Sequence, residues 1–346
     1  MNNFVLFFKV IQFKKIIYFL FPLFLTYPIF GQYSSFDTVP VHTIGAGLAS
    51  EGIALRDPLL NITSNPAFLA GTSSPILDTG VMVPFQGTQS AALKPSHFGV
   101  YYPLDSVSGI GVRGRNLFQS SFPSDSRSTY FQTQVFYSRQ FKDIFYYSLG
   151  LGPGVGFRGG EQSNLSFSPF VSLGLKYNKF TAGFSAQNPG GVFRYKSYRS
   201  ADVLEERLPP TIGLGMSYDI TGNLQVYSEL RRILYERSSF TLNGDETKPK
   251  FDRGIGGEVK LSLGLSLAIR EDSVWKIRTG LEMAGKYDET GKNRRGTGIG
   301  FGFGYIPNPN GNGFQFNFAL LDYSLISPKN GYPSETLFFV SLGYLY

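Results

Sequence analysis

A long series of short segments with two unlike faces is the feature that most constrains this chain. Close to the C-terminus, Phe314, Phe316 and Phe318 alternate with Gln315 and Asn317. Alternation with a period of two makes a β-strand with one apolar and one polar face. One such strand would also fit a soluble sandwich. Many in succession, with scarcely any helical pattern between them, favour a closed barrel whose apolar face meets lipid.

The connections between these segments alternate in length. Short turns are expected at 104–106, 142–143, 177–179, 219–222, 271–273 and 307–312, and longer polar loops at about 86–95, 119–127, 158–164, 196–208, 238–253, 286–295 and 326–335. Thirteen connections separate fourteen strands, or twelve if one hairpin is merged. Short turns on one rim and long loops on the other are typical of outer-membrane barrels. The sequence therefore predicts an all-β fold, a transmembrane antiparallel β-barrel of about 14 strands over residues 76–346.

Composition excludes several classes of protein. The chain has no cysteine, which rules out a disulfide scaffold, a thiolate zinc site and a lipid anchor on cysteine. The net charge of +7 falls to +4 once the three lysines of residues 1–31 are removed. The remaining basic residues are scattered, so nothing favours nucleic-acid binding.

The N-terminus carries the only long apolar run. Three lysines precede the run at 16–30, and Gly31 offers a small residue at a plausible cleavage point. This layout predicts a secretory signal peptide over residues 1–31, removed after export by a Sec-type route. The alternative is a retained helical anchor, but the run is shorter than the roughly 20 residues of a span and contains Pro22 and Pro28.

Residues 32–75 lack strand alternation and are rich in small residues. A barrel of fourteen strands is too wide for its own side chains to fill, because about eight strands already make an interior that they just close. The segment 32–75 is the only part of the chain assigned neither to the signal peptide nor to the barrel, so it is expected to form a plug inside the barrel. A periplasmic tail is the alternative.

The polar face of the strands is expected to line the lumen. It would receive Arg113, Lys176, Gln225, Glu229, Arg231, Lys260, Lys276, Arg278 and Glu282. Of these, Arg113, Lys176 and Arg278 are candidates to pair with the carboxylate of an anionic solute, since charge-assisted hydrogen bonds favour anions.

The aromatic residues have two possible roles that the sequence leaves open. Tyr102, Tyr137, Tyr218, Trp275, Tyr305 and Tyr344 lie near strand ends, as an interfacial girdle requires. Lumen-facing aromatic residues such as Tyr101, Phe170 and Tyr227 would instead line an apolar path.

Nothing in the sequence indicates an enzyme, a cofactor or a metal site. Residues 109–114 fit the dinucleotide pattern GxGxxG, but they alternate within a strand and no helix follows. His42 and His97 are the only histidines, so a zinc site would depend mostly on carboxylates. One alternative is that His97 activates a serine as a nucleophile, but no nucleophile motif supports it. The simpler interpretation is that His97 is a hydrogen-bonded histidine within a strand.

The N-terminal segment resembles a known family. Its motif comprises Gly45, Gly47, Gly52, Asp57, Asn65, Pro66 and Ala67. This pattern resembles the hatch of the FadL-like outer-membrane barrels, which include long-chain fatty-acid transporters and shorter PorV/PorQ-type proteins linked to type IX secretion. Here Phe68 replaces the usual glycine, and Ser50 and Glu51 replace a Met-Gly-like pair.

The resemblance implies a channel for uptake of hydrophobic or amphipathic small molecules, such as a fatty acid, in the outer membrane of a Gram-negative (diderm) bacterium. Its surroundings would be membrane lipid. The alternative is a PorV-like platform whose external loops, especially 196–208 and 238–253, bind a secreted protein partner. The short loops favour that branch. A structural surface barrel without a solute is a third possibility.

Overall fold

The structure is a computed structural model, and the residues that it describes begin at His42. They run to Tyr346 apart from 87–88, 91–92, 118–128, 159–160, 189–191, 197–202, 208–209, 235–238, 243–244, 248–256, 271–273, 285–296, 309–312 and 324–334. The signal peptide predicted at 1–31 lies outside the described residues.

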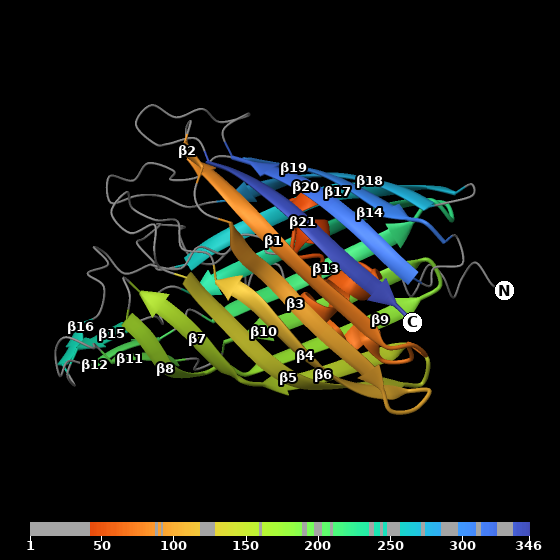
Figure 1. The fold of residues 1–346 in the computed structure, drawn as a ribbon. Coiled ribbons are helices and arrows are strands. Elements are labelled where there is room, and N and C mark those ends of the chain that lie inside the picture. Colours follow the sequence, from red (N-terminus) through yellow and green to blue (C-terminus); the bar gives the residue numbers. More distant parts are fainter. Residues whose placement is uncertain are drawn as a thin grey trace.

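The strands close into an antiparallel barrel of fourteen staves (Figure 1). Closure comes from the pairing of β1 (Ile76–Gln86) with the last strand, β21 (Glu335–Leu345), along their whole lengths. Eight staves are the single strands β1, β3 (Lys94–Pro103), β4 (Ser108–Leu117), β5 (Thr129–Phe141), β18 (Val274–Ala284), β19 (Gly298–Ile306), β20 (Gly313–Asp322) and β21. The short β2 (Gln89–Ser90) pairs with the end of β1.

Six further staves each combine two strands. They are β6 (Phe145–Leu151) with β7 (Pro153–Arg158), β8 (Glu161–Phe167) with β9 (Phe170–Tyr177), β10 (Phe180–Gln187) with β11 (Val192–Lys196), β12 (Val203–Arg207) with β13 (Thr211–Asp219), β14 (Leu224–Leu234) with β15 (Ser239–Leu242), and β16 (Asp245–Thr247) with β17 (Gly257–Arg270). The prediction of fourteen strands is confirmed.

Four predicted loops are partly wrong. Strands β12, β15 and β16 occupy parts of 196–208 and 238–253, β8 occupies part of 158–164, and β2 and the start of β3 lie within 86–95. In β12 three charged residues, Glu205, Glu206 and Arg207, follow one another. A strand with polar residues on both faces shows no alternation, so the periodicity could not reveal it.

The outer face of the wall is apolar and the inner face is polar, as β20 shows. Phe314, Phe316 and Phe318 are 52%, 41% and 50% exposed, whereas Gln315 and Asn317 are 2% and 0% exposed. A water-soluble barrel would show the reverse, because large apolar side chains are normally buried. The prediction that the aromatic face points away from the lumen is confirmed.

The nine polar residues predicted for the lumen follow the same rule. Arg113, Glu229, Arg231, Lys260, Arg278 and Glu282 are buried, and Lys176, Gln225 and Lys276 are half-buried.

The structure separates the two roles of the aromatic residues. On the outer face, Trp275 packs against Tyr305, with ring centroids 4.4 Å apart and the rings tilted by 37°. Tyr101, Phe170 and Tyr227 are instead buried inside, at 0%, 1% and 6% exposure. The first pair fits an interfacial girdle, and the second group lines the interior.

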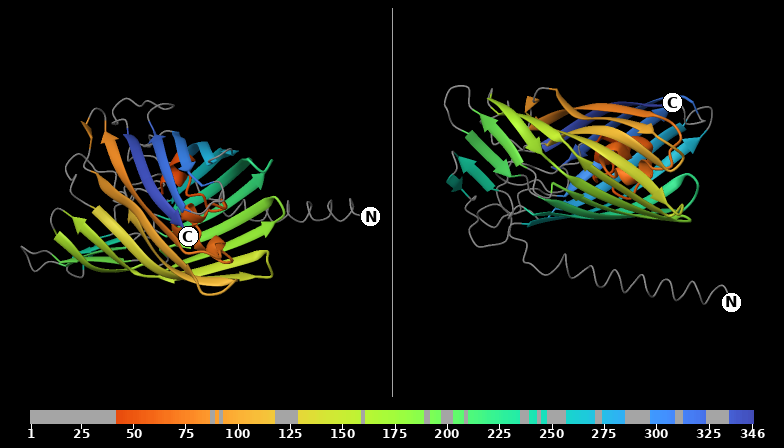
Figure 2. Two further views of the ribbon diagram at one scale, coloured as in Figure 1. Left: turned by 45° about the vertical axis from the view of Figure 1, so that its right-hand side comes forward. Right: turned by 90° about the horizontal axis from the view of Figure 1, so that it is seen from below.

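Residues 42–75, here called the inner segment, lie inside the barrel (Figure 2). They form α2 (Thr43–Gly47), α3 (Pro58–Thr63) and the 3₁₀ helix η1 (Pro66–Leu69). Among the described residues, no helix is long and apolar enough to cross a membrane. The segment ends beside the last strand, where the backbone N–H of Tyr346 donates to the Pro75 carbonyl at 3.1 Å.

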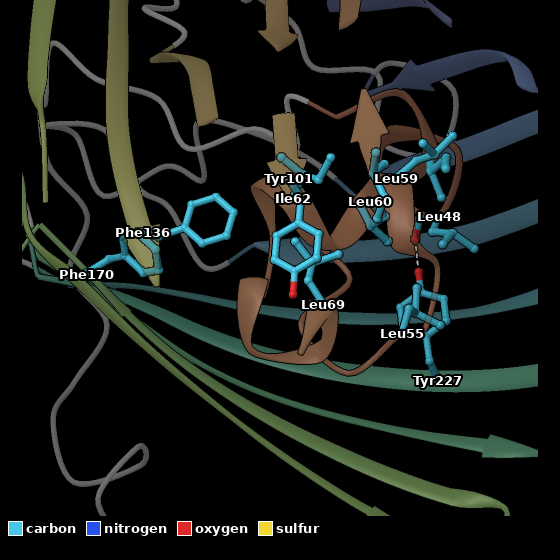
Figure 3. Packing of buried hydrophobic residues seen from close by; sticks show 12 residues of the cluster. Leu48, Leu55, Leu59, Leu60, Ile62, Leu69, Tyr101, Phe136, Phe170 and Tyr227 are labelled. Atoms are coloured by element: carbon cyan, nitrogen blue, oxygen red, sulfur yellow. Dashed lines mark hydrogen bonds between the residues drawn. The ribbon is translucent and has the colours of Figure 1, made fainter. Parts of the chain in front are cut away.

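The inner segment has its own apolar core, which packs against aromatic residues of the wall (Figure 3). Leu48, Leu59 and Leu60 are at most 1% exposed. Tyr227 of the wall reaches this core and donates its hydroxyl hydrogen bond to the Leu48 carbonyl. Phe136 lies to one side, close to another ring of the wall.

Candidate functional site

The candidate site is the contact between the inner segment and the surrounding wall. Helix α3 starts locally for a clear reason: Asp57 is its N-cap, accepts the Leu59 N–H at 3.2 Å, and is followed by Pro58 in the first helical position. Helix α2 is capped by His42, whose Nδ1 accepts the Ile44 N–H at 3.1 Å.

Asp57 also joins the inner segment to β18. Its Oδ2 lies 3.0 Å from Lys276 Nζ and 3.5 Å from Arg278 Nη2. Burial opposes ionisation of this carboxyl, but the two neighbouring cations outweigh burial, so the pKa of Asp57 is below its ordinary value. Arg278 Nη1 also donates to Asn317 Oδ1 at 3.3 Å. Arg278 thus contacts the inner segment.

A group of five charged residues holds the next part of the segment, and we call it the charge network. It consists of Glu51 of the inner segment, Glu229 and Arg231 of β14, Lys260 of β17 and Glu282 of β18. Arg231 lies 2.6 Å from Glu282 and 3.3 Å from Glu51, and Lys260 lies 3.0 Å from Glu282.

The Glu229 carboxylate of this network binds the backbone of the inner segment directly. Its two oxygens accept the N–H groups of Glu51 at 3.1 Å and Ile53 at 2.9 Å. Hydrogen bonds to an ionised carboxylate are stronger than neutral ones. The network therefore fixes where the segment lies along β14.

Arg113 of β4 also holds the inner segment, but it lies beside aromatic rings and not among carboxylates. Its Nη1 donates to the Thr63 carbonyl at 2.6 Å and its Nε donates to Gln134 at 2.8 Å. The guanidinium carbon lies 3.6 Å from the centroid of the Phe170 ring. Its Nη2 is buried and has no hydrogen-bond partner within the described part of the chain.

The three cations predicted to pair with an anionic solute, Arg113, Lys176 and Arg278, therefore do not form a single cluster. Arg113 and Arg278 both contact the inner segment, but through Thr63 and Asp57 respectively. Lys176 of β9 is half-buried, and its backbone N–H donates to the Ile144 carbonyl at 2.9 Å. Their role in pairing with an anion stays a prediction.

The Asn-Pro-Ala step of the predicted motif ties the inner segment to itself and to β9. Asn65 Nδ2 donates to the Ile53 carbonyl at 2.8 Å and to the Leu173 carbonyl at 3.0 Å. Pro66 and Ala67 begin η1, and Ser138 of β5 donates to the Pro66 carbonyl at 2.7 Å.

The three glycines of the motif lie earlier in the segment. Gly45 and Gly47 are in α2, where a Cβ on Gly47 would lie 2.6 Å from the Gly302 Cα of β19. Gly52 has a φ of +76°, which glycine adopts readily.

One group was not expected from the sequence. His42 Nε2 lies 2.6 Å and His97 Nε2 lies 2.9 Å from the same oxygen, Asp78 Oδ2. All three residues are at most 1% exposed. The sequence contained one signal, since Asp78 is the single charged residue in the otherwise uncharged β1, and a buried charge needs a partner.

Comparison with known proteins rests on structure alone, because no protein-family model and no curated protein matches the sequence. The CymD monoaromatic hydrocarbon channel superposes with a TM-score of 0.67 and 13% identity, over 90% of this chain and 99% of that chain. The toluene transporter TodX of Pseudomonas putida gives 0.64 and 12%, over 90% and 99%.

A FadL homologue of Pseudomonas aeruginosa gives a TM-score of 0.62 at 12% identity, over 90% of this chain and 99% of that chain. The chain has the FadL-like barrel fold. This result confirms the fold predicted from the resemblance. Of the three, CymD is described as a channel and TodX as a transporter.

Proposed function

We propose that the chain is an outer-membrane channel for hydrophobic or amphipathic small molecules, in which the inner segment acts as a hatch. The apolar outer face supports a place in a lipid bilayer. Structures of similar fold are described as channels or transporters for toluene and monoaromatic hydrocarbons, which supports the solute class.

The observation that carries the proposal is how the inner segment is held. It contacts the wall on β4 through Thr63, on β14 through Glu51 and Ile53, and on β18 through Asp57. A further contact reaches β9 through Asn65. These contacts hold the segment inside the lumen, on the path that we propose for the solute. All these contacts are non-covalent, so the segment is able to shift as a solute passes.

The chemistry beside Arg113 favours a solute with an apolar body and one anionic group. The rings of Tyr101 and Phe136 are stacked with centroids 6.3 Å apart, and Phe136 meets Phe170 edge-on at the same distance. Arg113 presents a buried Nη2 without a partner among the described residues. A carboxylate would satisfy it with a charge-assisted hydrogen bond.

A reversible disulfide tests the hatch. The natural chain has no cysteine, so an introduced pair is unambiguous. A Cβ on Gly215 of β13 would lie 3.3 Å from the Ile53 Cβ, near the roughly 3.5–4.5 Å of disulfides. It would also lie 2.9 Å from the Ala54 backbone N, so the segment must shift slightly to admit it, and the reduced double variant is compared with the unmodified chain. We expect Ile53→Cys with Gly215→Cys, once oxidised, to reduce uptake of labelled toluene or a labelled long-chain fatty acid to the level of cells without the protein. Reduction should restore it.

Each single cysteine variant is the control, because it carries the same substitution without a bridge. The choice between the two solutes assigns the preferred class. Uptake by the oxidised double variant equal to that of its reduced form would contradict a moving hatch. Uptake of neither solute above background by the unmodified chain would contradict the channel itself.

A further inference from the structure

Two histidines share one carboxylate where the inner segment begins. We call His42, Asp78 and His97 the His–Asp–His cluster. Nε2 of each histidine lies within hydrogen-bond distance of Asp78 Oδ2, at 2.6 and 2.9 Å. The imidazole rings lie close together and are tilted, with centroids 4.1 Å apart and an angle of 31° between the ring planes. These three residues come from the inner segment, β1 and β3, so the cluster joins the segment to the wall.

The backbone of β3 is shaped to place His97 there. The pairing of β1 with β3 shifts register between Gly80 and Val81, opposite Ser96, which is a β-bulge. The bulge turns both Ser96 and His97 inward, and both are at most 1% exposed. Ser96 Oγ lies 2.9 Å from His97 Nδ1. Gly80 leaves room for the ring, because a Cβ there would collide with the His97 side chain.

The hydrogen bonds define the tautomer of His42. Its Nδ1 accepts the Ile44 N–H, so Nδ1 carries no proton and the neutral ring has its proton on Nε2. That proton is donated to Asp78. A metal ion at Nε2 would need the proton to move to Nδ1, where it would face the Ile44 N–H. The arrangement is therefore suited to protons rather than to a metal.

We propose that the His–Asp–His cluster is a proton-operated latch, in which neutral His42 holds the start of the inner segment on the wall and an added proton releases it. The consequence for transport rests on the proposed function, since release of the latch would free the hatch. The latch itself is a property of the fold and can be tested without a solute.

Protonation opposes docking in two ways. A proton on His42 Nδ1 replaces the acceptor that caps α2 with a donor aimed at the Ile44 N–H. The added charge would also lie in a buried site, where burial opposes the charged form of His42. Asp57 is the other charged group that acts on His42, and Lys276 and Arg278 already pair with it.

The balance of these groups sets the direction of the pH dependence. Burial and the neighbouring His97 lower the pKa of His42 below 6.5, more than Asp78 and Asp57 raise it. The docked segment therefore binds fewer protons than the released one. Its docking free energy is fully present above the ordinary pKa of 6.5 and is lost as the pH falls from there toward the lowered pKa.

Hydrogen–deuterium exchange on the whole chain in lipid or detergent measures the latch. We expect the amides of residues 44–50 to exchange roughly tenfold faster at a pH of about 5.5 than at about 7.5, after correction for intrinsic rates. His42→Gln with His97→Gln should abolish this dependence. Glutamine can still accept from the Ile44 N–H and donate to Asp78, but it does not titrate. Equal protection of the unmodified chain at both pH values would overturn the latch.

A second measurement needs no substitution. The chain contains only two histidines, so ¹⁵N-histidine NMR shows the cluster alone. We expect His42 to be neutral with its proton on Nε2 at a pH of about 7.5. A proton on Nδ1, or a shift of both signals with stronger amide protection when Zn²⁺ is added, would overturn the proposal in favour of a metal site. Neither result depends on uptake, so a failed latch and a failed channel are distinguishable.

Discussion

The two faces of the barrel wall are built by alternate residues of the same strands, yet they use their residues differently. On the outer face Phe316 and Leu342 are 41% and 39% exposed, and many apolar residues would serve there. On the inner face Arg231 contacts three particular carboxylates, and Asn65 of the inner segment bonds to two particular carbonyls. A residue on the outer face needs only to be apolar, whereas a residue on the inner face must also place its polar atoms at particular partners.

This difference explains how two proteins can share this fold although their sequences are little alike. The CymD channel has a TM-score of 0.67 with this chain at 13% identity. A lipid-facing surface requires only that its residues be apolar, so it can change freely.

The largest effect is expected when a charge is removed from the inner face. Glu282→Gln leaves Arg231 and Lys260 without their shared carboxylate at 2.6 and 3.0 Å. Breaking a buried ion pair from one side costs about 3–5 kcal/mol. We expect the free energy of unfolding, measured by denaturant in lipid vesicles, to fall by that amount.

Asp143→Asn is the matched control for Glu282→Gln. Asp143 is an exposed acid in the turn between β5 and β6, and its oxygen accepts from Gln140 at 3.0 Å, which asparagine can also do. Exposed substitutions of this kind change stability by about 0.5 kcal/mol or less. Equal effects at the two positions would remove the distinction between specific inner contacts and the rest of the surface.

The next largest effect concerns polarity on the outer face. Phe316→Arg places a charge on the exposed side of β20 and should cost about 2–4 kcal/mol near the bilayer midplane. Phe316→Leu keeps the site apolar, so we expect a cost below about 1.5 kcal/mol. The measurement is again unfolding in vesicles. A leucine variant as unstable as the arginine variant would show that the outer face also depends on shape.

Most of the wall could be predicted from the sequence because its information is local. The alternation of Phe316 with Gln315 gives both the strand and its faces, and turn signals gave the count of fourteen staves. The inner contacts could not be predicted in this way. Glu229 binds the N–H of Glu51 across 178 residues, and no local pattern encodes that separation.

The His–Asp–His cluster shows the same limit in one strand. His97 alternates with Phe98 and lies two residues before Gly99, so a period of two places it on the same face as the buried Tyr101, and His97 is 1% exposed. Alternation could not reveal the bulge that turns the adjacent Ser96 inward as well, because a bulge interrupts the period of two. His42, the third member of the cluster, lies in a segment without any period-two alternation of apolar and polar residues.

The smallest of these effects tests geometry without changing charge or polarity. Gly47→Ala adds one methyl group to α2, and its Cβ would lie 2.6 Å from the Gly302 Cα, which is backbone and cannot rotate away. Overpacking of this kind costs about 1–3 kcal/mol. We expect faster hydrogen–deuterium exchange in the inner segment while the strands stay protected. Gly222→Ala is the control, because a Cβ there meets nothing within 4 Å. Unchanged exchange in Gly47→Ala would mean that the inner face, like the outer one, tolerates a change of shape.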